Sequence, residues 1–212
     1  MKSEGVCSFC KRAFAGSGMT RHLASCPERK KGIESEKGKG KVFLIKAGIG
    51  PFWVYFEVNA TSALKMVDSF LRDLWLECCG HMSSFTINDE QYMSEPWEDY
   101  KGMNAKLEKV IAPGTEFLHE YDFGSTTELE MKCISEREGS VKGIQIITRN
   151  NPIEFSCDEC GKPATQICSQ CLWEGKGFLC DSCIEDHECG EEMLLPVVNS
   201  PRMGVCAYTG DD

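Results

Sequence analysis

Hydrophobic and polar residues between positions 41 and 150 follow patterns that predict a domain of mixed strands and helices. Two runs rich in β-branched and aromatic residues, 42–46 and 52–58, are typical of strands. The turn sequence Gly-Ile-Gly-Pro at 48–51 separates them. Further strands are expected at 85–87, 116–123, 128–134 and 143–148.

A helix is predicted to begin at Thr61 or Ser62 and to end near Leu76, with Gly80 beyond it. Its apolar residues recur at intervals of three and four, which places them on one face. These residues are Leu64, Val67, Leu71, Leu74 and Trp75. Strands grouped around one or two helices predict the α+β fold class, here a central mixed layer flanked by two small zinc-stabilised modules.

The distribution of cysteine and lysine divides the 212 residues into four zones. Residues 1–30 form a small cysteine-containing module, and residues 31–40, rich in Lys, Glu and Gly, are expected to be a flexible basic linker. Residues 41–150 are the central domain, and residues 151–212 form a cysteine-rich module with an apolar tail.

Fourteen cysteines are far more than an average chain of this size carries, so disulfides and metal sites both need consideration. No apolar run follows the first basic residues, as it would in a signal peptide, and no stretch is long enough to span a bilayer. The expected location is therefore the cytoplasm. Disulfides do not persist in that compartment, which favours zinc as the partner of these thiols.

The cysteine-rich module carries three Cys-x2-Cys pairs and a terminal His-x-Cys pair. Two intervening residues allow both sulfurs to reach one ion, and eight ligands suit two tetrahedral zinc ions. A redox Cys-x-x-Cys normally stands alone, and an iron–sulfur cluster would gain nothing from the histidine. The expected ligands are Cys157, Cys160, Cys168, Cys171, Cys180, Cys183, His187 and Cys189.

The spacing alone allows either successive sites or an interleaved cross-brace. The alternation of pairs resembles B-box and related treble-type fingers. That resemblance implies that the first and third pairs share one ion and that the second and fourth share the other. Because only one residue separates His187 from Cys189, these two ligands are closely spaced, and Cys206 could replace either of them. With every protein position filled, no coordination site is expected to remain for catalysis.

The N-terminal module has the order Cys7-x2-Cys10, then His22-x3-Cys26. It resembles a ββα zinc finger with a final cysteine, in which Phe14 and Met19 would form the small core. A third zinc ion is therefore expected here. A single finger reads only about 3 base pairs, but the lysines and arginines that follow it could add non-specific affinity for DNA.

The central domain resembles the plasmid pRiA Orf-three-like family through PFWVYFEVNATSALKMVDSFLRDLWLECCGHMSSFTI and the later YDFG. The matching residues are Pro51, Trp53, His81, Phe85, Tyr121, Asp122, Phe123 and Gly124. The chain departs from the family pattern at Ser125-Thr126-Thr127, which replaces an acidic residue, Gly and Trp. The resemblance implies no established activity.

The cysteine and histidine side chains singled out in the central domain are expected to have structural roles. Cys78 and Cys79 are interpreted as small buried hydrophobes and His81 as a hydrogen-bonded structural histidine. His119 is expected to be exposed on its strand. Glu120 and Asp122 point to one side of that strand, and together with His81 they define an alternative enzymatic hypothesis.

The leading hypothesis is a non-enzymatic protein with about three zinc ions and no catalytic residues, which acts as an interaction or adaptor protein. The net charge of −10 is uneven, because residues 1–46 carry eleven Lys or Arg against four acids. This basic segment supports a second hypothesis, a DNA-associated accessory protein of a mobile element. The acidic remainder would be repelled by a phosphate backbone.

Overall fold

The computed structural model describes residues 2–35, 38–97 and 99–210 and confirms the α+β class. The chain forms two compact units. The first comprises Met1–Phe70 and Met82–Asn151, and the second comprises Leu71–His81 and Pro152–Asp212. Among the described helices, none has the length and apolar character needed to cross a membrane.

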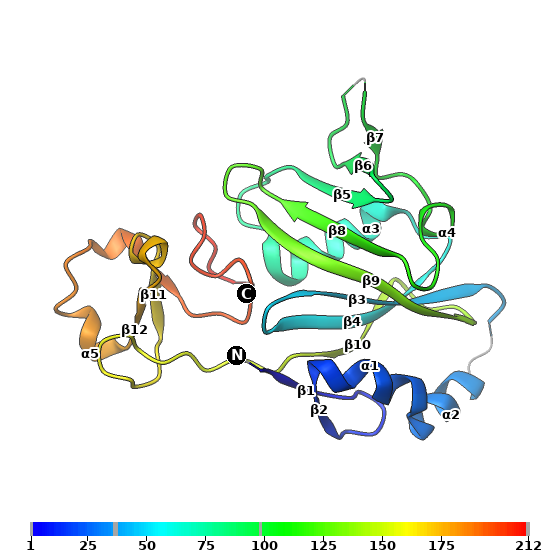
Figure 1. Ribbon diagram of the computed structural model, residues 1–212, viewed down its shortest axis with the longest axis horizontal. Helices are drawn as coiled ribbons and strands as arrows, with labels where there is room; N and C mark the ends of the chain where they lie inside the picture. The colour runs from blue at the N-terminus through cyan, green and yellow to red at the C-terminus, as the bar shows by residue number, and fades with distance from the viewer. Residues whose placement is uncertain (1, 36–37, 98, 211–212) are drawn as a thin grey trace. The chain divides into compact units, whose positions relative to one another are not determined.

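The first unit is built on an eight-stranded sheet with the order β10-β4-β3-β9-β8-β5-β6-β7 (Figure 1). All neighbouring pairs are antiparallel except β6 and β7. The strands are β3 (Lys41–Ile49), β4 (Phe52–Asn59), β5 (Ser83–Ile87), β6 (Glu90–Met93), β7 (Lys101–Gly102), β8 (Glu116–Tyr121), β9 (Thr127–Glu138) and β10 (Ile144–Arg149).

Strand β4 is apolar along nearly its whole length because both of its faces are covered. Trp53 and Tyr55 on one face belong to a buried cluster with Met19 and Leu23 of the N-terminal module. Phe56 points to the opposite face, where its ring lies 4.8 Å from that of Phe70. A strand buried on both faces loses the alternation of a half-exposed strand, which explains the sequence FWVYFEV.

Helix α3 (Leu64–Leu71) buries Leu64, Val67 and Leu71, as the spacing predicted. It does not continue to Leu76 as a regular helix, since Arg72–Leu76 form the π-helical turn η1. The backbone N–H of Glu77 closes this turn on the carbonyl of Arg72, five residues earlier. A shorter helix, α4 (Leu107–Val110), follows β7.

The N-terminal module forms the predicted ββα arrangement from β1 (Glu4–Val6), β2 (Ala13–Ala15) and α1 (Gly16–Ser25). It packs on the sheet within the same compact unit. Helix α2 (Pro27–Ser35) follows directly, so part of the segment expected to be a flexible linker is helical. Linker positions 36 and 37 lie outside the described residues, and positions 38–40 are described but belong to no helix or strand.

The second unit contains little regular structure apart from a three-stranded sheet with the order β12-β11-β13. Its strands are β11 (Gln166–Cys168), β12 (Phe178–Leu179) and β13 (Leu194–Pro196). Between them lie the short helices η2 (Cys171–Glu174), α5 (Asp181–Ile184) and η3 (Glu191–Met193). Since β13 pairs with β11, the start of the apolar tail packs back on the cysteine-rich module.

Candidate metal centres

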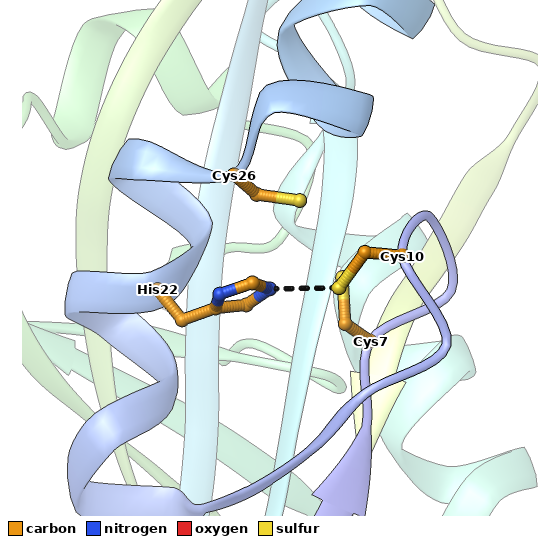
Figure 2. Close-up of side chains that lie close together, drawn as sticks. All are labelled: Cys7, Cys10, His22 and Cys26. Carbon is orange, nitrogen blue, oxygen red and sulfur yellow. Dashed lines mark hydrogen bonds between the residues drawn. The ribbon is translucent and has the colours of Figure 1, made fainter.

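The N-terminal module brings Cys7, Cys10, His22 and Cys26 together, with all four ligand atoms within 4.8 Å of one another. Two ligands come from the β1–β2 hairpin and His22 comes from α1 (Figure 2). The Sγ of Cys10 lies 3.3 Å from the Nε2 of His22. Zinc–ligand bonds of about 2.0–2.3 Å in a tetrahedron separate neighbouring ligand atoms by about 3.3–3.8 Å, so this group could hold an ion.

Two of the Cys-x2-Cys pairs share one backbone motif, which we call the knuckle. In the N-terminal knuckle the amide of Lys11 donates to the carbonyl of Cys7, and the amide of Cys7 donates to that of Arg12. The knuckle at Cys157 repeats both bonds with Gly161 and Lys162. The residue after the second cysteine has a positive φ in each, 60° for Lys11 and 75° for Gly161. This turn directs both sulfurs to one point.

The cysteine-rich module contains two further groups of ligand atoms, each within 4.8 Å. In these groups the first Cys-x2-Cys pair lies with the third, and the second lies with the His-x-Cys pair, as in the interleaved cross-brace. One group is Cys157, Cys160, Cys180 and Cys183, and the other is Cys168, Cys171, His187 and Cys189. The Sγ of Cys160 lies 3.5 Å from that of Cys180, and the Sγ of Cys171 lies 3.7 Å from that of Cys189.

Backbone amides favour the thiolate form at two of these cysteines. The N–H of Arg12, the strongest influence on Cys10, lowers the pKa of this thiol to about 7. Burial alone would raise the pKa of Cys157, but the amides of Cys160, Cys180 and Glu159 together lower it to about 6. Because zinc binds the thiolate, these amides prepare the ligands for an ion.

A fourth group, which the sequence analysis did not predict, consists of Cys78, Cys79, His81 and Cys206. The interpretation of Cys78 and Cys79 as buried hydrophobes is wrong, since Cys79 is exposed and Cys78 only partly buried. Cys206 lies with these residues and not with His187 and Cys189. The local signal was the close Cys-Cys-x-His spacing, but Cys206 is 125 residues away from His81.

The groups considered for an enzymatic site have other neighbours. Glu120 accepts a hydrogen bond from Ser84, and Asp122 accepts one from the amide of Gly124. His81 lies in the fourth group instead, with its Nε2 3.0 Å from the Sγ of Cys79. Two described surface hollows, of 280 and 660 Å³, are lined by neither of the two carboxylates.

His119 was expected to be exposed, and this prediction is wrong because the side chain is fully buried. Its Nε2 lies 2.8 Å from Oδ1 of Asp68, which also accepts a hydrogen bond from Ser83. Asp68 belongs to α3, whereas His119 and Ser83 belong to β8 and β5. This buried polar network therefore fastens the helix to the sheet.

Several of the basic residues considered for DNA binding are paired with acids. Arg29 is buried and donates to Glu57 at 2.6 Å. Lys31 pairs with Glu28, and Lys41 pairs with Glu136. These pairings reduce the positive charge that the segment offers to a phosphate backbone, and Lys37 lies outside the described residues.

The fold and these groups define an α+β protein in which the Cys and His side chains of the described residues form four sets that could hold metal ions. No family model matches the chain, and no curated protein matches it. One solved structure similar to it is a protein of unknown function, MM3350, from Methanosarcina mazei Go1. The sequences are 18% identical, the TM-score is 0.42, and the match covers 52% of this chain and 68% of that chain.

Proposed function

We propose that this chain is a non-enzymatic zinc protein that binds another protein through its cysteine-rich module. The observation that carries the proposal is the completeness of the ligand groups, each of which supplies four Cys or His donors. Tetrahedral zinc with four protein ligands stabilises structure, whereas catalytic zinc keeps one position for water or substrate. The ions at the N-terminal group and the two groups of the module would accordingly build the fold.

The surface around η2 supports a protein partner. Trp173 is 82% exposed, and large exposed aromatic side chains are frequent anchors of protein interfaces. Residues 156–212 carry three basic residues against eleven acids, a net charge of −8. A partner with basic residues around an apolar recess would complement this surface, and nucleic acid would be repelled by it.

The test is an affinity capture with the zinc-loaded full chain, followed by a binding titration with the protein that it retains. We expect Trp173→Ala to weaken binding at least tenfold, as for an interface anchor, while the zinc content and circular dichroism stay unchanged. Chelation should abolish binding because the module would unfold.

Trp97→Ala is the matched control, because Trp97 is also exposed, at 53%, but lies in the first unit. It should leave the affinity unchanged. Equal binding by the wild type and Trp173→Ala would contradict the assignment of the surface. Binding that survives complete removal of zinc would contradict the role of the module.

DNA association remains the second candidate, favoured by the excess of basic residues in segment 1–46. Against it, the base-reading positions −1, 3 and 6 of a ββα finger correspond here to Ala15, Gly18 and Arg21. Deleting the finger would also remove part of the buried cluster of the first unit. The sharper test is Arg12→Glu with Arg21→Glu, which should abolish a salt-sensitive gel shift if DNA is bound.

A further inference from the structure

The distribution of cysteine over the fold singles out the fourth group. Thirteen of the fourteen cysteines belong to one of the four groups, and so do three of the four histidines. The remaining Cys133 is buried in β9, and the remaining His119 is buried against Asp68. The fourth group thus has the same composition as the N-terminal one, three thiols and one imidazole.

The distances within the fourth group suit a tetrahedral ion. The Sγ of Cys79 lies 3.7 Å from that of Cys78 and 3.6 Å from that of Cys206. The Nε2 of His81 lies 3.7 Å from the Sγ of Cys206. These values match the separation of about 3.3–3.8 Å for ligands of one zinc ion, and the 3.0 Å between the Nε2 of His81 and the Sγ of Cys79 is slightly shorter. They are far longer than the S–S bond of about 2.05 Å in a disulfide.

Glu77 holds the first three ligands in place. One oxygen of its carboxylate accepts a hydrogen bond from Arg72 at 2.6 Å, and the other accepts one from the amide of Gly80 at 2.6 Å. Gly80 has a φ of 79°, a conformation that glycine adopts without strain. The chain therefore reverses between Cys79 and His81, so that both side chains reach one point.

A separate set of contacts positions Cys206. Ser200 donates to the carbonyl of Trp75 at 2.7 Å and accepts from the amide of Arg202 at 2.9 Å, in a buried setting. Arg202 is fully buried and extends its Nη2 to 3.7 Å from the Sγ of Cys78. A guanidinium beside the ligands suits an anionic centre, since three thiolates and one Zn²⁺ leave one net negative charge.

We propose that Cys78, Cys79, His81 and Cys206 bind a fourth zinc ion, which fastens the loop at 200–206 to the segment that follows α3. A donor set of three thiolates and one imidazole that can surround one tetrahedral ion selects zinc. The four ligands and the residues that support them through these contacts all lie in the second unit. The site does not depend on the proposed protein partner.

The first test is differential alkylation of the native, zinc-loaded full chain with N-ethylmaleimide, read out by peptide mass spectrometry. Cys79 and Cys206 are exposed, so the reagent can reach both thiols when no ion covers them. We expect both to be protected until a chelator is added and then to be labelled. Cys133 is the internal control, because burial raises the pKa of this thiol to about 12 and keeps it unreactive while the sheet is folded.

Metal analysis gives an independent readout. The wild type should contain about four zinc ions per chain, Cys206→Ala about three, and the control Cys133→Ala about four. Rapid labelling of Cys79 and Cys206 while Cys157 stays protected, or equal zinc in the wild type and Cys206→Ala, would overturn the fourth site and leave the other three intact. A Cys79–Cys206 or Cys78–Cys79 disulfide, released by reductant and not by chelator, would also overturn it.

Discussion

Glu57 is one of the residues that couple the N-terminal module to the sheet. The residue is 1% exposed, and its carboxylate accepts hydrogen bonds from Arg29 of α2 and from Arg137 of β9. Two guanidinium groups share one buried carboxylate, so both would lose this negatively charged partner if it were removed. Breaking such a group by removing one partner is strongly destabilising.

We therefore predict that Glu57→Gln lowers the free energy of unfolding by about 3–5 kcal/mol. Urea denaturation of the zinc-loaded chain, followed by far-ultraviolet circular dichroism, measures this change. Glu28→Gln is the control, since Glu28 pairs with Lys31 at the exposed surface, and we expect less than about 1 kcal/mol there. Equal effects of the two substitutions would show that the buried triad contributes little.

At the scale of elements, the two knuckles differ in the residue that adopts the left-handed conformation. Gly161 adopts it freely, whereas Lys11 adopts it as a non-glycine residue. A Cβ at Gly161 would meet nothing within 4 Å, so the backbone angle alone determines the cost of a substitution there. Gly18 in α1 has equally open surroundings but no positive φ.

Gly161→Ala is therefore predicted to destabilise its knuckle by about 1 kcal/mol, which corresponds to a loss of zinc affinity of about fivefold. Competition with a chromophoric chelator measures this loss. Gly18→Ala should instead stabilise helix α1, because alanine favours a helix over glycine by up to about 1 kcal/mol. A gain in zinc affinity for Gly161→Ala would refute the role of the backbone angle.

The elements that periodicity predicted are those with strong local patterns. The strands expected at 42–46, 52–58, 128–134 and 143–148 correspond to β3, β4, β9 and β10. The prediction missed β6, β7 and α4, which are four residues or shorter and carry no repeating pattern. Their structure depends on neighbours that are distant in the sequence, such as the pairing of β6 with β5.

The same limit explains what the sequence revealed of the metal centres. A Cys-x2-Cys pair indicates a metal site through its local spacing alone, so the candidate ligands of three groups could be predicted from the sequence. The fourth group combines adjacent cysteines with a residue more than a hundred positions later. The hydrogen bonds of Ser200 and Arg202 bring that residue to them, and no local spacing encodes such contacts.

At the scale of the whole molecule, the two units differ in what stabilises them. The first is organised by an eight-stranded sheet and its apolar core. The second has a three-stranded sheet of short strands. Three cysteines that belong to the candidate ligand groups, Cys157, Cys168 and Cys180, form the buried part of its hydrophobic cluster together with Leu179. Its fold should therefore depend on metal far more than that of the first unit.

Removing zinc is accordingly predicted to abolish hydrogen-exchange protection across β11, β12 and β13 while β3, β4 and β9 stay protected. Hydrogen exchange with mass spectrometry, with and without chelator, measures both in one sample. Restoring zinc should recover the protection. Retained protection in the second unit without metal would refute the structural role of the ions.

The separation of Cys206 from its partners has a consequence for biosynthesis. On the ribosome, the ligands of the N-terminal centre emerge within a span of twenty residues, from Cys7 to Cys26, so that this centre can load early. Cys78, Cys79 and His81 emerge long before translation reaches Cys206. Their thiols must wait in reduced form, and this centre closes after the intervening polypeptide has been made.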